Sequence, residues 1–235
     1  MILFGTCIIT IINQDSIWIG ADNKRYSVEK NLMNEHSTQN QKIFEKDGFY
    51  FFFCGISQAY DHNKNIYFDP QKIMDSAITE FKEYNDVYEN FTSQIPHKLN
   101  LVTNQTLKNN PKYFLSEMLN KPPIFGGQLI QFTKGIKKIK TFDYCIVGTN
   151  QNNWTVREQP SSLTSDTFIT FSGTYTNAQN YFMQNFRSLY PSSDYKKLIT
   201  DLIRIEAQNN NYKVGMPVNV LAIQNDSHTW YLDNY

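Results

Sequence analysis

Three residues in the first fifth of the chain have the types and spacing of a hydroxyl nucleophile with an acid and a base. Thr6 follows Gly5, Asp22 lies sixteen positions after Thr6 (22 − 6 = 16), and Lys42 precedes an apolar run. A threonine hydroxyl is a weak nucleophile, so it needs a neighbouring base. Together these residues could direct the Thr6 oxygen onto a carbonyl carbon.

Strands are predicted to hold these residues in place. Thr6–Ile12 and Ile17–Asp22 are apolar runs joined by a short polar turn, which predicts a hairpin. Neither run alternates cleanly, so we expect both faces to be covered. The apolar residues from Ile2 to Ile12 are too few to span a bilayer and carry no basic side chain. They are therefore predicted to form the first core strand, not a signal peptide.

A second hairpin is predicted around a turn signal. Ile43–Phe44 and Phe49–Cys54 flank Lys46-Asp47-Gly48, and Gly55 is expected to end the second strand. Later in the chain, apolar residues at helical intervals predict helices at 70–81, 111–119, 181–189 and from 195 to about 209. Further strands are predicted at 128–132, 136–144, 167–171, 218–223 and 229–232. The segments 26–41 and 149–166 are polar and resemble loops, while 88–111 is polar and gives no prediction of helix or strand.

Composition narrows the possible classes of function. The 22 basic and 22 acidic residues cancel, so no global field indicates a nucleic-acid partner. No run is long and apolar enough for a membrane helix. The four histidines are scattered without a metal-ligand spacing, and no cofactor is expected. The three cysteines, Cys7, Cys54 and Cys145, are an odd number without paired spacing, which indicates reduced thiols and a cytoplasmic location.

The order of these motifs resembles that of proteasome β-type subunits and their bacterial relatives, which are N-terminal-nucleophile hydrolases. The quoted motifs are Gly20-Ala21-Asp22, Lys42-Ile43-Phe44, Ser172-Gly173-Thr174 and the stretch 215–223. The resemblance covers 5–60 and 166–224 and is poor over 88–165. It implies an α+β fold, a four-layer αββα sandwich, in one domain spanning 1–235 with residues 1–5 as a short propeptide.

The resemblance also implies a role for each matching residue. Cleavage between Gly5 and Thr6 would free the amine of Thr6, which then serves as the base for its own hydroxyl. Asp22 would hold the ammonium of Lys42, which lowers the effective pKa of the hydroxyl. The remaining implied roles are an oxyanion donor at Gly55, support from Ser172 and from Asn219, where the family has Asp, and a specificity pocket of Phe53, Cys54 and Ser57.

The implied function is a threonine hydrolase that cleaves peptide amide bonds in peptides or unfolded proteins. Members of this family stack into rings, so a homo-oligomer is expected. Three alternatives stay open. The chain could be a catalytically silent structural or assembly subunit, which Asn219 favours because an amide cannot hold a charge. It could be an amidase for small molecules. Cys7 could replace Thr6 as nucleophile, although the spacing to Asp22 would then shift by one residue.

Overall fold

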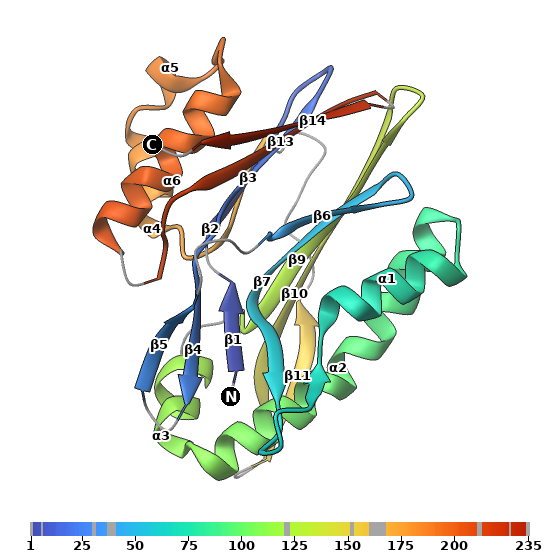
Figure 1. The fold of residues 1–235 in the computed structure, drawn as a ribbon, viewed down its shortest axis with the longest axis vertical. Helices are drawn as coiled ribbons and strands as arrows, with labels where there is room; N and C mark the ends of the chain where they lie inside the picture. Colours follow the sequence, from blue (N-terminus) through green and yellow to red (C-terminus); the bar gives the residue numbers. More distant parts are fainter. Residues whose placement is uncertain are drawn as a thin grey trace.

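The computed structural model describes residues 2–5, 7–29, 32–36, 41–119, 123–150, 153–159, 168–210, 213–225 and 227–233. These residues form a mixed α+β structure with two antiparallel sheets (Figure 1). Thr6 lies outside the described residues.

The larger sheet has nine strands among the described residues. Its main path runs β11-β10-β9-β7-β1-β4-β5, and β6 and β8 pair with β7 beside that path. The strands are β1 (Ile2–Gly5), β4 (Arg25–Glu29), β5 (Leu32–His36), β6 (Ile43–Lys46), β7 (Phe49–Tyr60), β8 (Ile66–Phe68), β9 (Phe125–Thr133), β10 (Ile136–Asn150) and β11 (Asn153–Gln159).

The smaller sheet has five strands among the described residues, in the order β12-β2-β3-β13-β14. They are β2 (Cys7–Ile12), β3 (Ile17–Asp22), β12 (Ile169–Gly173), β13 (Val218–Gln224) and β14 (Ser227–Asp233). The predicted first hairpin is confirmed, because β2 and β3 pair from Ile8 opposite Ala21 to Ile12 opposite Ile17. The second hairpin, β6 with β7, is confirmed as well.

Helices flank the sheets on opposite sides of the molecule (Figure 1). The helices are α1 (Pro70–Glu80), α2 (Tyr84–Asn109), α3 (Pro111–Tyr113) with the π-helical turn Phe114–Leu119, α4 (Thr176–Gln184), α5 (Phe186–Leu189) and α6 (Tyr195–Asn209). Two of them start at an aspartate cap. Asp69 accepts the Lys72 N–H at the start of α1, and Asp194 accepts the Lys197 N–H at the start of α6.

Three apolar clusters hold the elements together. One packs α1 and α2 against the larger sheet, a second packs α4 and α6 against the smaller sheet, and a third fills the space between the sheets. Neighbouring residues of β2 show this division, since Ile9 belongs to the second cluster and Ile8 to the third. A strand that is buried on both faces needs apolar residues at consecutive positions. This explains why the run at 7–12 does not alternate.

The sequence predicted that the apolar run from Ile2 to Ile12 forms one strand, and this prediction is wrong. Ile2–Gly5 pairs with β7 and β4 in the larger sheet, whereas Cys7–Ile12 pairs with β3 and β12 in the smaller one. The chain therefore passes from one sheet to the other between Gly5 and Cys7. Hydrophobicity alone could not reveal this crossing, because both parts of the run are apolar.

The sequence predicted that Gly55 ends its strand, and this prediction is wrong. β7 continues to Tyr60, and Gly55 lies inside it with a φ of +76°. A Cβ at this position would also lie 2.2 Å from the carbonyl oxygen of Ile124. Glycine is thus required here both for its left-handed backbone and for the close approach of another chain segment.

Three polar segments for which the sequence predicted no helix or strand contain regular structure. The described parts of 26–41 belong to the β4–β5 hairpin, and 153–159 forms β11 against β10. Backbone pairing satisfies the donors and acceptors of such strands without apolar side chains, so the pattern is weak. The third segment lies in the long helix α2, whose interior contains Pro96. That proline concealed its buried stripe of Val87, Phe91, Ile95, Leu99 and Val102.

Candidate functional site

The carboxylate of Asp22 is the centre of the candidate site. It lies at the end of β3 and is fully buried. Its Oδ1 accepts hydrogen bonds from the Cys7 backbone N–H at 2.9 Å and from Lys42 Nζ at 2.8 Å. Its Oδ2 accepts the backbone N–H groups of Lys24 at 3.1 Å and Gly215 at 3.2 Å. These four donors come from four separate places in the sequence, so this one side chain ties them together.

Lys42 supplies the positive charge of the site. It precedes β6, and its side chain is 2% exposed against 0% for Asp22. A buried ion pair needs additional hydrogen bonds to offset the loss of water. The backbone donors around Asp22 provide them, so the pair is held in one geometry. The predicted contact between Asp22 and Lys42 is present.

The neighbours of Thr6 are fixed on both sides, although Thr6 itself is outside the described residues. Gly5 pairs with Gly55 of β7, and the Cys7 N–H donates to Asp22. The backbone of Cys7 therefore contacts the Asp22–Lys42 pair directly. Three predicted site residues therefore lie near the same part of the chain: Asp22, Lys42 and Gly55.

The end of β12 lies beside the start of β2. Ser172 pairs with Ile8 and Gly173 with Cys7. The predicted Ser172 thus lies on the strand that neighbours β2, and it is partly buried. Strand β12 also contacts β7, where the backbone of Gly173 lies near Cys54 and acts, against the larger effect of burial, to lower the pKa of its thiol.

Asn219 contacts the residue that follows Asp22. On β13 it pairs with Ala21, and its Nδ2 donates to Asn23 Oδ1 at 2.9 Å. The described hydrogen bond therefore goes to the residue after Asp22 and not to Asp22. Asn219 supports the loop that follows β3.

Sequence reasoning missed the backbone donors of Lys24 and Gly215. Any residue except proline has a backbone N–H, so no side-chain pattern identifies such a donor. Gly215 offered a weak signal, because it opens the motif at 215–223. A Cβ on Gly215 would lie 3.0 Å from Cδ of Lys24, which is a tight contact. A small residue there lets the 215 segment approach Asp22.

A small cavity opens beside Lys42. Its volume is about 20 Å³, and its described lining residues are Lys42, Phe44, Phe53, Ser57, Gln58, Asp69, Pro70 and Gln71. Of the three residues predicted to line a specificity pocket, Phe53 and Ser57 line this cavity. Cys54 is not among the lining residues. Side chains alternate along a strand, so Cys54 faces the opposite side of β7 from Phe53.

The alternative nucleophile Cys7 is poorly placed for chemistry. Its side chain is fully buried, and burial together with the Asp22 charge raises the pKa of the thiol well above its usual range. The thiolate is the reactive form of cysteine, so Cys7 is inert in this environment. Burial also raises the pKa of Cys54 to about 12 and that of Cys145 to about 11.

Within the described ranges, no three His, Cys, Asp or Glu side chains gather closely enough to hold a metal ion. None of the helices in the described part of the chain is long and apolar enough to cross a membrane. The site thus consists of an ion pair, backbone donors and a small cavity beside the crossing between the two sheets.

Comparisons with known proteins give a distant likeness in fold. No family model matches the chain, and no curated protein matches it. A structure of Thiobacillus denitrificans BPH in complex with epoxomicin is 13% identical, with a TM-score of 0.47, and the match covers 94% of this chain and all of that one. A second structure of Thiobacillus denitrificans BPH is 12% identical, with a TM-score of 0.46, over 93% of this chain and 98% of its own. This chain is thus distantly similar in fold to that protein over nearly its whole length.

Proposed function

We propose that the chain is a proteasome-like threonine hydrolase, which cuts its own Gly5–Thr6 bond and then cleaves peptide amide bonds. The observation that supports this most is the double engagement of Asp22. One of its oxygens binds both Lys42 and the N–H of Cys7, the residue directly after Thr6. A buried ammonium and the backbone of Cys7 thus share one carboxylate oxygen, and in the proposal the Thr6 hydroxyl lies near this ammonium. The ammonium favours the negatively charged form of a nearby oxygen.

In the proposed reaction the freed amine of Thr6 accepts the hydroxyl proton as the oxygen attacks a peptide carbonyl carbon. The amine then gives that proton to the departing nitrogen, and the C–N bond breaks to leave an ester on Thr6. Water hydrolyses the ester and restores the hydroxyl. Lys42 stabilises the negative charge that develops, and the backbone N–H of Gly55 is the proposed oxyanion donor.

The position of β1 suggests how a peptide would bind. Ile2–Gly5 lies as a strand between β7 and β4 and forms antiparallel pairs with both. Once this segment is cut and leaves, two strand edges face the vacated space. An extended peptide could then bind there by strand addition, with its backbone hydrogen-bonded on both sides. We therefore propose that residues 1–5 are a propeptide that occupies the substrate position.

The proposal includes the fold and assembly that the resemblance implies. Three apolar clusters alternate with two sheets and two sets of helices, as a four-layer αββα sandwich of one domain requires. Three free, buried cysteines are compatible with a reducing compartment such as the cytoplasm. A stacked homo-oligomer, acting on unfolded proteins or peptides, completes the proposal.

The first experiment is an intact mass measurement with N-terminal sequencing of the purified chain. We expect a chain that begins at Thr6 and that hydrolyses fluorogenic peptides. The Thr6→Ala variant should retain residues 1–5 and lose all turnover, whereas Thr6→Ser should keep part of both activities because it retains a hydroxyl. Turnover by Thr6→Ala would contradict the mechanism.

A catalytically silent assembly subunit is the second candidate. The observation that favours it is the amide pair Asn219–Asn23, which replaces an acid of the implied catalytic set with a neutral side chain. This candidate predicts that the chain keeps its first residues, that Thr6→Ala changes nothing, and that Asn219→Asp does not produce turnover. A chain that starts at Thr6 would exclude it.

A further inference from the structure

We infer that the enzyme prefers peptides with a short, uncharged side chain, alanine or serine, at the residue whose carbonyl is attacked. This inference rests on the proposed function and concerns the cavity beside Lys42. Four features of that cavity carry it: its volume, its rigid aromatic walls, a buried hydroxyl without a described partner, and the register of β1.

The volume limits what can enter. The cavity holds about 20 Å³. A cavity of roughly 10 to 15 Å³ is enough for one water molecule, so there is space for about one methyl or hydroxyl group. The side chains of leucine, tyrosine and arginine are several times larger. They would fit only if the walls moved.

The walls resist such a movement. Phe53 is 5% exposed and stacks between Phe91 and Phe125, with centroid distances of 5.7 Å to each. Phe44 packs on the same ring at 6.3 Å and on Phe51 at 5.4 Å. Because packed interiors yield little, a larger substrate side chain would have to displace several rings at once.

The polar groups of the cavity favour a neutral side chain. Both oxygens of Asp69 are engaged, one by Gln58 Nε2 at 3.0 Å and the other by the Lys72 N–H. The negative charge of Asp69 disfavours an acidic side chain, and the positive charge of Lys42, which also lines the cavity, is already paired with Asp22. The Ser57 Oγ is buried and has no hydrogen-bond partner among the described residues. A buried polar group without a partner is unfavourable, so a serine hydroxyl entering the cavity would gain a bond there.

The register of β1 places the cut end of the chain at this cavity. Gly5, the residue before the proposed cut, pairs with Gly55. Gly55 lies two positions from Phe53 and from Ser57, both of which line the cavity. Glycine has no side chain, so the chain's own residue 5 leaves the cavity unfilled. A substrate residue at this register could fill it with a methyl or hydroxymethyl group.

The test is a panel of fluorogenic peptides that differ only at the residue before the cut, with Gly, Ala, Ser, Leu, Tyr, Arg and Glu. We expect kcat/KM for Ala and Ser to exceed that for Leu, Tyr and Arg by about tenfold or more, since a pocket that rejects one methylene discriminates by roughly 10- to 200-fold. Equal or faster turnover of Leu, Tyr or Arg peptides would overturn the inference and leave the proposed function intact. Absence of turnover with every peptide would overturn both.

Two variants test the assigned walls. Phe44→Ala should enlarge the cavity and raise the Leu/Ala ratio of kcat/KM about tenfold, and Phe44→Leu, which disturbs packing less, should raise it in the same direction. Ser57→Ala should lower the Ser/Ala ratio several-fold. Ser93→Ala, on the exposed face of α2, is the matched control and should leave both ratios unchanged. Unchanged ratios in the Phe44 and Ser57 variants would overturn the assignment of the cavity.

Discussion

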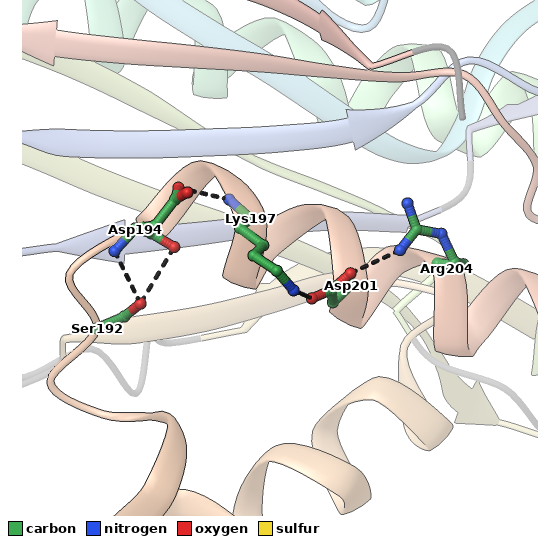
Figure 2. Close-up of polar contacts among 5 residues, drawn as sticks. All are labelled: Ser192, Asp194, Lys197, Asp201 and Arg204. Atoms are coloured by element: carbon green, nitrogen blue, oxygen red, sulfur yellow. Dashed lines mark hydrogen bonds and ion pairs between the residues drawn. The ribbon is translucent and has the colours of Figure 1, made fainter.

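Two sets of ion pairs among the described residues have similar lengths and opposite surroundings. Lys42 Nζ lies 2.8 Å from Asp22, with both side chains almost fully buried. On the outer surface of α6, Asp201 lies 2.5 Å from Lys197 and 2.6 Å from Arg204, where the side chains are 36% to 71% exposed (Figure 2). The exposed contacts are the shorter ones, yet we expect the buried pair to matter far more.

Burial, not distance, decides how much an ion pair matters for stability. Water screens the exposed charges and already solvates each of them separately, so little is gained when they meet. In the interior, a charge whose partner is removed has nothing to replace it. The buried pair is therefore held in one geometry, as the proposed catalysis requires. The exposed row can rearrange without consequence.

The largest effect is expected from Lys42→Met, which breaks the buried pair. The carboxylate of Asp22 is left without its cation, and the free energy of unfolding should fall by about 3 to 5 kcal/mol. Self-cleavage at Gly5–Thr6 should stop. Urea denaturation and intact mass measure the two effects.

The double variant Asp22→Asn/Lys42→Met is the control for this comparison. It removes both charges, so we expect it to be more stable than the sum of the two single changes by about 1 kcal/mol or more. Simple additivity would show that the two side chains do not stabilise each other, and the comparison with the surface would then fail.

A second buried acid, Glu206, has amide groups as its described hydrogen-bond partners. Glu206 is fully buried and accepts the backbone N–H groups of Asn177 and Ala178 at the start of α4, together with the side-chain amides of Asn177 and Asn210. Glu206→Ala leaves these donors unsatisfied and should cost about 1 to 3 kcal/mol of unfolding free energy. Glu206→Gln keeps an acceptor oxygen and should cost less. We expect self-cleavage to persist in both, because Glu206 serves α4 and not the site.

The contribution of a third acid, Asp143, to the free energy of unfolding should depend on pH. Burial, with a smaller effect of the Glu158 charge, raises the pKa of Asp143 from 3.8 to about 6. The folded state therefore binds the proton more tightly, and this contribution to stability is complete below pH 3.8 and disappears as the pH rises to about 6. Asp143→Asn should stabilise the protein at pH 7 by about 1 to 2 kcal/mol, since Asp143 is only partly buried and water screens its charge.

Urea denaturation of the Asp143→Asn variant and the parent protein between pH 4 and 7.5 checks this expectation. The stability difference should grow from pH 4 to 6 and remain constant above that range. A difference that stays the same at every pH would mean that the Asp143 carboxyl does not change its affinity for a proton on folding.

The smallest effect is expected on the surface of α6. Lys197→Ala removes the exposed contact with Asp201, and we expect no measurable change in the free energy of unfolding or in self-cleavage. The same denaturation experiment at low and high salt would separate the two kinds of pair, because salt should weaken the exposed pairs much more than the buried one. A loss comparable to that of Lys42→Met would refute the role given to burial.

The family resemblance was enough to predict the Asp22–Lys42 contact. The two N-terminal hairpins were predicted from the sequence pattern itself, because each has two apolar runs on either side of a turn signal. Three features were not predicted: the change of sheet between Gly5 and Cys7, the passage of β7 through Gly55, and the helix α2. These features depend on which strand is a neighbour in space, or on packing that overrides a proline. The backbone donors of Lys24 and Gly215 were hidden for a simpler reason, because almost every residue has one.

The three cysteines give the molecule a set of internal reporters. Cys7 is packed between the smaller sheet and its helices, Cys54 lies on β7 near the end of β12, and Cys145 lies on β10. All three are free and buried, so a thiol reagent can reach each one only when its own surroundings open. Labelling followed by peptide mass analysis would thus compare the local opening of these three places in the native chain. Cys7 is one residue from the proposed cut, so its labelling rate would report whether cleavage loosens the crossing between the two sheets.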